Sequence, residues 1–411
     1  MTTISRGTLH ASTSRDKAGR SFPYYVLHRD RVRKNILDMK LAFEQYYGNF
    51  MIAYSFKTNY LRQIIEEVSG RGGMAEVVSP YELSYALKLG LFQPNRIVYN
   101  GVTPDARTKF NLAAKGGIVN VDNIAEFQDI ANIAYEKSTP IKLGVRVNFE
   151  ISNGLCSRFG VDISSDEFRN MMDLLTHDDL VSFGGFHCHI GTARPANYWI
   201  EKAEAMIHLA KKYGAKYIDL GGGMYGPMIE ELATQFSGYA GDFNEYAEPI
   251  CSRMKEAFPM QDVMLIVEPG TALVGNTMDL YCHVTDVKNV RGKTYITVDT
   301  CSNHIGMICE CRTIPTKLIK DKSSGEMRTI VHDATIAGCT CLEFDYIRKG
   351  FDGDVAIGDM ILFENVGAYS IGASRQFIIP RPMVVDYETG EIIRQRETPG
   401  DMFWRYLASD E

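Results

Sequence analysis

The chain has 411 residues, of which 45% are hydrophobic and 23% charged, a composition that excludes a disordered or fibrous protein. Its 44 Lys and Arg against 51 Asp and Glu give a net charge of −7, and no basic block indicates a nucleic-acid surface. No run approaches the roughly 18 apolar residues that cross a bilayer, so no membrane association is expected. The nine cysteines, an odd number, and an N-terminus without an apolar signal segment favour reduced thiols and a cytoplasmic enzyme. The length of the chain predicts one large domain or two ordinary ones.

Short apolar runs bounded by turn residues predict strands along the first two thirds of the chain. In order they are FMIAYS (50–55), MAEVVS (74–79), RIVYN (96–100), GIVNVD (117–122), IKLGVRVNF (141–149), FGGFHCHI (183–190), KYIDL (216–220) and VMLIVEP (263–269). Segments between them, such as 79–90 and 197–214, have helical spacing and end at Gly. Eight strands alternating with helices predict a (β/α)8 TIM barrel, with a doubly wound open sheet as the alternative.

After about residue 270 the pattern changes to successive strand-like segments with few helices. They are DLYCHVTDVKNV, KTYITVDT, DATIAGCT, DMILFEN and RQFIIPRPMVVDYETGEII. This texture predicts an antiparallel β domain, to which SFPYYVLHRD (21–30) could add a strand. The expected division is a barrel over 30–270 and a β domain built from 1–29 plus 271–411.

Polar side chains stand at the carboxyl ends of the predicted barrel strands, where such barrels carry their chemistry. They are Lys57, Glu76, Asn100, Arg146, His187, His189, Gly221-Gly222-Gly223 and Glu268. A lysine of lowered pKa, a carboxylate and a side-chain-free turn are what pyridoxal 5'-phosphate (PLP) requires for its Schiff base, its ring nitrogen and its phosphate. Each residue alone has an ordinary structural explanation, and the prediction of a PLP site rests on the whole set.

The glycine-rich turn allows a different interpretation. Gly221, Gly223 and Gly226 satisfy the G-x-G-x-x-G pattern of dinucleotide-binding folds. That motif normally opens the first βα unit, whereas here six predicted strands precede the strand that leads into it. An NAD-dependent oxidoreductase is therefore the weaker hypothesis, because it also leaves Lys57 without a role.

Several segments together resemble the fold-type III PLP-dependent decarboxylases, the group of ornithine, arginine and diaminopimelate decarboxylases, with alanine racemase as a distant relative. The resemblance runs from about Phe22 to about Phe377. It rests on FPYYVLHRD, AYSFKTN, AEVVSPYEL, SRFGVD, GFHCHIGT, DLGGGMYG, VEPG, GCTCLEFD and FENVGAYSIGASRQF. It implies an alanine-racemase-like barrel with a C-terminal β domain, PLP as cofactor, and α-decarboxylation of an amino acid.

The resemblance also implies roles for individual residues around the cofactor. Lys57 would be the Schiff-base lysine, His189 would stack on the ring, and Glu268 would pair with the ring nitrogen. Gly221–Gly223 would hold the phosphate, with Thr192 where the family usually has Ser.

Further residues follow from the same resemblance. Arg146 and Glu76 would order the groups around the ring and the Schiff base, and Tyr369 would touch the phosphate and border the substrate. Cys341 matches the family's catalytic cysteine, which reaches the active site from the partner subunit and protonates the carbanion. The resemblance therefore implies a homodimer with composite active sites.

Three departures from the family concern the phosphate and the substrate. After VEPG the family usually has Arg, and this chain has Thr271. After the catalytic cysteine the family has an acidic residue that grips a distal ammonium, and this chain has Leu342. The third departure is Arg312, in the loop expected to contact the far end of the substrate. Leu342 and Arg312 together predict a substrate whose far end is a carboxylate or an acylated group, as in siderophore-type decarboxylases. Diaminopimelate is the alternative substrate.

Two further alternatives remain at this point. Cys309-x-Cys311 and Cys339-x-Cys341 could form a zinc site, but structural zinc sites usually have C-x2-C spacing, and no metal is expected. A racemase, or a decarboxylase-like regulator without activity, could share the barrel. Cys341 in its GCTC context favours a decarboxylase, and a regulator would be expected to have lost Lys57 or Cys341.

Overall fold

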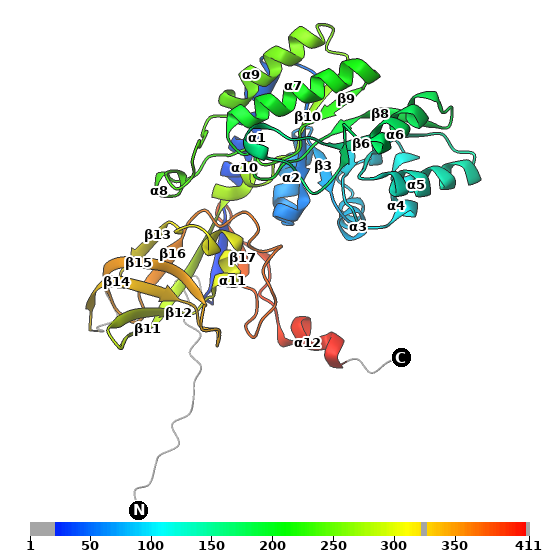
Figure 1. Cartoon of the computed structure of the whole chain (residues 1–411). Coiled ribbons are helices and arrows are strands. Elements are labelled where there is room, and N and C mark those ends of the chain that lie inside the picture. Colours follow the sequence, from blue (N-terminus) through cyan, green and yellow to red (C-terminus); the bar gives the residue numbers. More distant parts are fainter. Residues whose placement is uncertain (1–20, 322–326, 408–411) are drawn as a thin grey trace, which may run out of the picture. The chain divides into compact units, whose positions relative to one another are not determined.

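A computed structural model of the chain describes residues 21–321 and 327–407 (Figure 1). The described residues form two compact units. The larger unit comprises residues 28–278 and 365–374, and the smaller one takes the described residues of 1–27, 279–364 and 375–411. Residues 365–374 therefore group with the first unit although they follow most of the second unit in sequence.

The larger unit is a closed parallel barrel of eight strands. These are β2 (Phe50–Ser55), β3 (Met74–Val77), β4 (Ile97–Tyr99), β5 (Ile118–Val121), β6 (Ile141–Asn148), β8 (Val181–His187), β9 (Tyr217–Asp219) and β10 (Met264–Val267). The order β5-β4-β3-β2-β10-β9-β8-β6 closes through pairing of β5 with β6, and the short β7 (Val161–Asp162) extends β6. All eight predicted strands are confirmed, and the closure rules out the open sheet.

Helices connect the barrel strands, as Figure 1 shows. They are α1 (Arg29–Glu44), α2 (Arg62–Gly70), α3 (Pro80–Leu89), α4 (Ala106–Ala113), α5 (Ile124–Glu136), α6 (Asp166–His177), α7 (Ala196–Tyr213), α8 (Glu230–Ala233), α9 (Asn244–Ala257) and α10 (Thr271–Val274). The helices predicted over 79–90 and 197–214 are α3 and α7. Ser79 caps α3 by accepting the N–H of Glu82 (3.2 Å), and Gly90 and Gly214 end the two helices in the left-handed conformation.

Buried apolar side chains join the barrel strands to one another. Ala53, Met74, Val98, Tyr217 and Ile266 form one cluster, and each comes from a different strand. Burial of such side chains is the main favourable term in folding, so the apolar strand runs specify the barrel. The polar residues that follow several of these strands are then brought to one end.

The smaller unit is built on a nine-stranded, mostly antiparallel sheet. Its strands are β1 (Tyr24–Leu27), β11 (Met278–Val290), β12 (Lys293–Val298), β13 (Thr316–Ile319), β14 (Thr329–Ala337), β15 (Tyr346–Val355), β16 (Met360–Phe363), β17 (Met383–Asp386) and β18 (Ile392–Arg394); the helices are α11 (Ser302–Ile305) and α12 (Pro399–Leu407). The predicted β domain and the added N-terminal strand are confirmed. Two pairs, β1–β17 and β12–β14, are parallel, which the sequence did not indicate.

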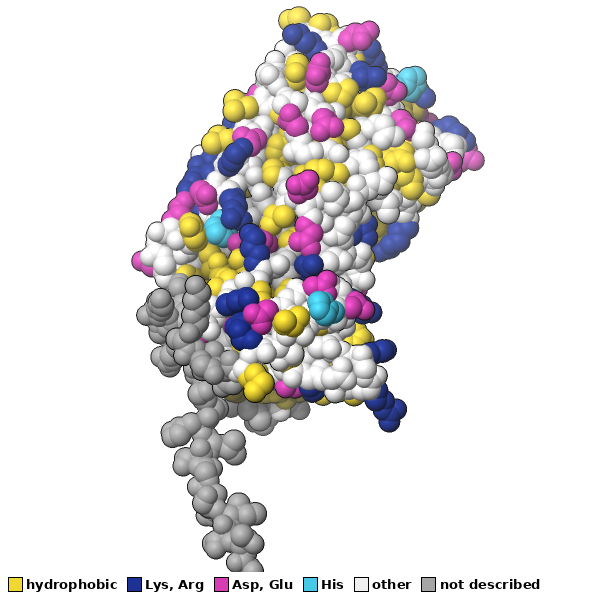
Figure 2. All heavy atoms as spheres, turned by 90° about the vertical axis from the view of Figure 1, so that its left-hand side faces the viewer, with side chains coloured by type: hydrophobic (Ala, Val, Ile, Leu, Met, Phe, Trp, Pro, Cys, Tyr) yellow, Lys and Arg dark blue, Asp and Glu magenta, His cyan; other side chains and the backbone are white. Residues whose placement is uncertain are grey.

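Charges of both signs are interspersed on the face of the molecule in Figure 2. On that face neither Lys and Arg nor Asp and Glu gather into one large patch. Among the described helices, none is long and apolar enough to cross a membrane.

In the smaller unit the carboxylate of Asp359 is buried and extensively hydrogen-bonded. Its oxygens accept from Arg328 (2.8 Å) and from the backbone N–H groups of Ala356 (2.9 Å) and Asp321 (2.8 Å). Burial alone would raise the pKa of Asp359, but these donors outweigh it and hold that pKa below its ordinary value. The ionised carboxylate therefore stabilises the folded state.

Replacing Asp359 with asparagine is expected to lower the free energy of unfolding near pH 7 by about 2–4 kcal/mol, because buried donors lose a charged acceptor. The wild type should lose this advantage as the pH falls below about 4, the ordinary aspartate pKa, and through the lower folded pKa. The difference between the two proteins should therefore shrink in acid. Thermal melts from pH 3 to 7 measure this difference, with Asp286→Asn, at a half-exposed position, as control. A constant difference across this range contradicts the argument.

Candidate active site

A cavity of about 420 Å³ in the barrel unit is bordered by residues at the carboxyl ends of the strands. Of the residues that the sequence analysis selected, it is lined by Lys57, Glu76, Asn100, Arg146, His187, His189, Gly222, Gly223, Glu268, Thr271 and Tyr369. These residues come from elements that are far apart along the chain. Convergence of this many selected polar residues on one cavity is the pattern of a ligand site rather than of a packed core.

Lys57 lies in a short 3-10 turn, Phe56–Thr58, directly after β2. Its Nζ is 2.6 Å from Glu76 Oε2, and the same oxygen accepts the hydroxyl of Ser55 (2.6 Å). Burial alone would lower the pKa of Lys57, but Glu76 and Glu268 outweigh it, and the pKa is raised. The expectation of a lowered lysine pKa is wrong for this arrangement, because the sequence did not reveal that two carboxylates would surround the ammonium group.

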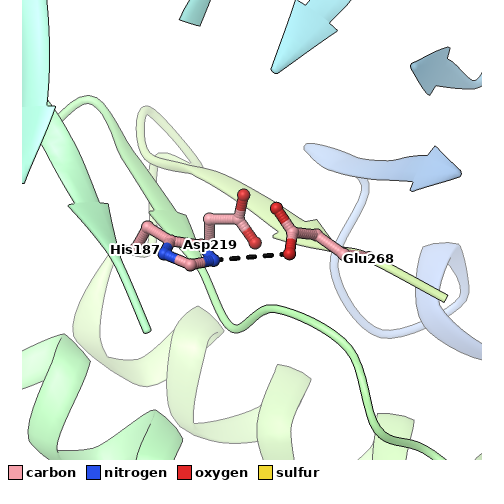
Figure 3. Close-up of side chains that lie close together, drawn as sticks. All are labelled: His187, Asp219 and Glu268. Carbon is pink, nitrogen blue, oxygen red and sulfur yellow. Dashed lines mark hydrogen bonds and ion pairs between the residues drawn. The ribbon is translucent and has the colours of Figure 1, made fainter. Parts of the chain in front are cut away.

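Glu268 follows β10 and is almost completely buried. Asn100 donates its side-chain N–H to Oε1, and His187 Nε2 lies 3.3 Å from Oε2 (Figure 3). Burial alone would raise the pKa of Glu268, but His187 and Lys57 outweigh it and lower that pKa to about 2. Glu268 is therefore an ionised carboxylate whose two oxygens are each positioned by a neighbour.

A chain of buried hydrogen bonds extends from Glu268 to residues of three other strands or strand ends. Because the carboxylate only accepts, Asn100 must turn its NH2 toward Glu268 and its oxygen toward Asn120, which donates to it (2.7 Å). The oxygen of Asn120 accepts the hydroxyl of Tyr217 (2.6 Å). The sequence analysis missed Asn120 and Tyr217. The one available signal was an asparagine inside the apolar run GIVNVD, which a buried strand would not carry without a partner.

Asp219, at the end of β9, was also missed. Its carboxyl group lies beside the carboxylate of Glu268 and the imidazole of His187 (Figure 3). One carboxylate oxygen of each acid and one ring nitrogen of His187 lie within 4.8 Å of one another. Burial, and then the charge of Glu268, raise the pKa of Asp219 well above its ordinary value, which favours the protonated form of this carboxyl group. Among the described residues this is the one group with metal-type ligands, and none of the four cysteines considered for zinc belongs to it.

His189 lies just beyond β8, in the loop that borders the cavity. Its Nδ1 accepts the backbone N–H of Gly222 (3.0 Å), which places the proton of the neutral ring on Nε2. Burial lowers the pKa of His189 to about 3, so the ring is neutral at physiological pH. The structure thus presents an uncharged imidazole to the cavity, fixed in orientation by the glycine-rich turn.

The glycine-rich turn tolerates no side chains at its first two positions. A Cβ on Gly221 would lie 2.5 Å from the carbonyl oxygen of Cys188, and a Cβ on Gly222 would lie 2.5 Å from that of Glu268. Gly221 and Gly223 also have positive φ, at +67° and +106°. Gly222 and Gly223 border the cavity, whereas Thr192 is exposed in the preceding loop and lies outside the lining set.

Two further predicted residues approach the cavity from different elements. Arg146, on β6, has a guanidinium nitrogen 3.8 Å from a carboxylate oxygen of Asp122. Its guanidinium carbon lies 4.6 Å from the centre of the Phe159 ring. Tyr369 belongs to segment 365–374, and its backbone N–H donates to the carbonyl of Thr58 (2.9 Å). Tyr369 has φ +56°, an unfavourable conformation for a residue with a side chain, which functional sites often retain.

Cys341, Leu342 and Arg312 all lie in the smaller unit. Cys341 is exposed, and its loop is organised by Asp345, which is buried. Asp345 accepts the hydroxyl of Thr340 (2.6 Å) and the backbone N–H of Ser302 (2.8 Å). The cysteine loop is therefore tied to the segment that leads to Arg312, and the thiol is presented at the surface of its own unit.

The residues of the barrel cavity fit PLP. Gly221 and Gly222 leave no room for a Cβ, so a phosphate can approach the backbone of this turn closely where Gly222 and Gly223 border the cavity. Lys57 is placed to hold the aldehyde group of PLP, and Glu268 is an ionised partner for the protonated nitrogen of the PLP ring. Together the closed barrel and this set of donors define a PLP-binding protein of the TIM-barrel type.

Residues 29–275, more than half of the chain, match the family described as "Pyridoxal-dependent decarboxylase, pyridoxal binding domain". The chain belongs to this family and is a PLP-dependent carboxy-lyase that acts on an amino acid. The diaminopimelate decarboxylase of Methanothermobacter thermautotrophicus is 27% identical over 92% of this chain and 90% of its own length. That of Aquifex aeolicus is 26% identical over 91% of this chain and 89% of its own length.

Solved structures confirm the fold. Diaminopimelate decarboxylase from Helicobacter pylori, complexed with L-lysine, superposes with a TM-score of 0.80 at 21% identity, covering 95% of this chain and 98% of that one. Lysine decarboxylase from Selenomonas ruminantium gives a TM-score of 0.73 at 19% identity, with coverage of 94% and 95%. The alanine-racemase-like barrel with a β domain, predicted from the resemblance, is therefore confirmed.

Proposed function

We propose that this enzyme removes the α-carboxyl group of meso-diaminopimelate or of a close analogue with both an ammonium and a carboxylate at its far end. The observation that carries the proposal is the extent of the similarity, since diaminopimelate decarboxylases align with nearly the whole chain. The Helicobacter pylori relative is complexed with L-lysine, the amino acid that remains when diaminopimelate loses one carboxyl group as CO2. This substrate was the alternative in the sequence analysis, and the comparisons favour it over the specialised-metabolite substrate.

In the proposed reaction the bond between Cα and the carboxyl carbon breaks, CO2 leaves, and a proton takes its place on Cα. PLP, when bound, supplies an electron sink for the electron pair left at Cα. Lys57 would hold the cofactor through its aldehyde carbon. Glu268, ionised and positioned by Asn100 and His187, would keep the ring nitrogen protonated.

We further propose that the enzyme works as a homodimer in which Cys341 of one subunit serves the barrel of the other. The Cys341 thiol would act as the general acid that protonates Cα. Its exposure, on the loop organised by Asp345, supports a role outside its own unit, because a buried thiol could not reach another subunit.

A second candidate substrate class is an amino acid whose far end is a carboxylate or acylated group without an ammonium. Leu342 favours it, because a distal ammonium buried beside leucine would lack the partner that an acidic residue provides. Arg312 could bind a carboxylate through two parallel hydrogen bonds. The two candidates differ in whether the far end of the substrate carries an ammonium group.

The test compares kcat/KM for diaminopimelate, lysine, ornithine and citryl- or glutamyl-type amino acids. The kcat/KM for diaminopimelate should exceed that for lysine and ornithine by at least about a hundredfold, because the latter two lack the distal carboxylate that Arg312 would bind. Arg312→Ala should reduce the preference for substrates with a distal carboxylate. Higher kcat/KM for the acylated substrates than for diaminopimelate would support the second candidate, and efficient turnover of ornithine or lysine would contradict both.

A further inference from the structure

The cavity is lined by three permanent cations, and one of them has no carboxylate partner among the described residues. Lys57 pairs with Glu76 at 2.6 Å, and Arg146 lies 3.8 Å from Asp122. Arg194 also borders the cavity, yet within residues 21–321 and 327–407 it makes no ion pair. Its Nε is buried and has no hydrogen-bond partner in that part of the chain. Such a group is costly to bury, so its position calls for an anion.

The guanidinium group of Arg194 is held by aromatic rings rather than by an acid. It lies over Tyr225, 4.9 Å from the ring centre, and over Phe236, at 5.9 Å. Stacking of this kind orients a guanidinium group while leaving its in-plane N–H groups free to donate. Tyr225 follows Gly222 and Gly223 closely in sequence, so the arginine lies on a residue of the glycine-rich segment.

The backbone of Arg194 is fixed to the same segment. The hydroxyl of Tyr246 donates to the carbonyl of Arg194 (2.7 Å) and accepts the N–H of Tyr225 (3.1 Å). One buried hydroxyl therefore joins the loop after β8 to the glycine-rich segment. The position of Arg194 relative to that segment is set by both its main chain and its side chain.

We propose that Arg194 supplies the cationic contact to the cofactor's phosphate in this enzyme. The turn of Gly222 and Gly223 borders the cavity with uncharged backbone only, and the N–H of Gly222 already donates to His189. Thr271, which borders the cavity where the family usually has arginine, offers only a hydroxyl. A phosphate dianion is stabilised by a charged partner, and an arginine can bind it with two parallel hydrogen bonds. Arg194 is the lining cation without an acidic partner, and it lies beside this turn, so the charge lost at Thr271 is restored from another loop.

The test measures cofactor affinity rather than turnover. The holoenzyme is stripped of PLP and titrated with PLP and, separately, with pyridoxal, which lacks the phosphate. Arg194→Met keeps an apolar side chain against Tyr225 and Phe236 but removes the charge, and should weaken PLP binding about tenfold or more. Pyridoxal affinity should change less than about twofold. Arg194→Lys should lie between wild type and Arg194→Met, and Arg253→Ala, at a partly exposed position outside the cavity, should match the wild type.

Each other outcome would overturn the proposal. Unchanged PLP affinity in Arg194→Met would mean that the arginine does not contact the phosphate. Equal weakening of PLP and pyridoxal would indicate that the substitution disturbs the cavity as a whole. Unchanged PLP affinity with a raised KM would assign Arg194 to a carboxylate of the substrate instead.

Discussion

Replacing Lys57 with alanine is expected to abolish the covalent, borohydride-reducible linkage of PLP and to reduce CO2 release by at least about a thousandfold. The reason is geometric: Lys57 is the lysine that lines the cavity, at the end of β2 and facing Glu76. The measurement combines visible absorbance of the purified protein, borohydride reduction followed by peptide mapping, and CO2 release.

Two variants separate the linkage from the charge of Lys57. In Lys57→Ala, Glu76 loses its cation and should take up a proton, because burial already raises its pKa. Lys57→Arg keeps a positive charge beside Glu76 but provides no primary amine. Both variants should lack the linkage, while Lys57→Arg should retain more of the wild-type thermal stability. A reducible linkage that survives in either variant would assign the cofactor to another lysine.

The barrel could be predicted from the sequence because the signals that define it are local. Each strand is a short apolar run whose β-branched residues suit a buried parallel sheet, and the helices α3 and α7 carry their own caps at Ser79, Gly90 and Gly214. Once eight such strands alternate with helices, the barrel brings their carboxyl ends together. The residues that follow the strands, such as Lys57 and Glu268, could therefore be selected from the sequence alone.

The hydrogen-bond partners inside the site could not be predicted in this way. Asn100, Asn120 and Tyr217 meet because of the register of β4, β5 and β9, and 97 positions separate the last two. Their pairing depends on where side chains point after the barrel has closed. The raised pKa of Lys57 was missed for the same reason, since it results from carboxylates on β3 and after β10.

The strand β15 was missed because it lacks the apolar pattern of the others. It reads YIRKGFDGDV, with two glycines and four charged residues, and only three of its ten positions are buried. It forms because β14 pairs with it from Thr329 to Ala337. The neighbouring strand, rather than local propensity, decides its conformation.

Mixing two inactive proteins, Lys57→Ala and Cys341→Ala, is expected to restore activity if the proposed composite site is correct. Random reassociation places about half of the molecules in heterodimers. In each heterodimer one barrel keeps Lys57 and receives an intact Cys341 from the other subunit, while the second site lacks both. Up to roughly a quarter of the wild-type activity should therefore return.

The same mixture distinguishes a site shared between subunits from one built within a single chain. If each chain supplied its own cysteine, both sites of the heterodimer would lack one residue, and no activity would return despite subunit exchange. Exchange is measured independently with differently tagged subunits. Mixing Lys57→Ala with Lys57→Arg is the matched control, because no combination of these chains contains Lys57. Recovery in the first mixture and not in the second follows only if Cys341 crosses to the partner's barrel.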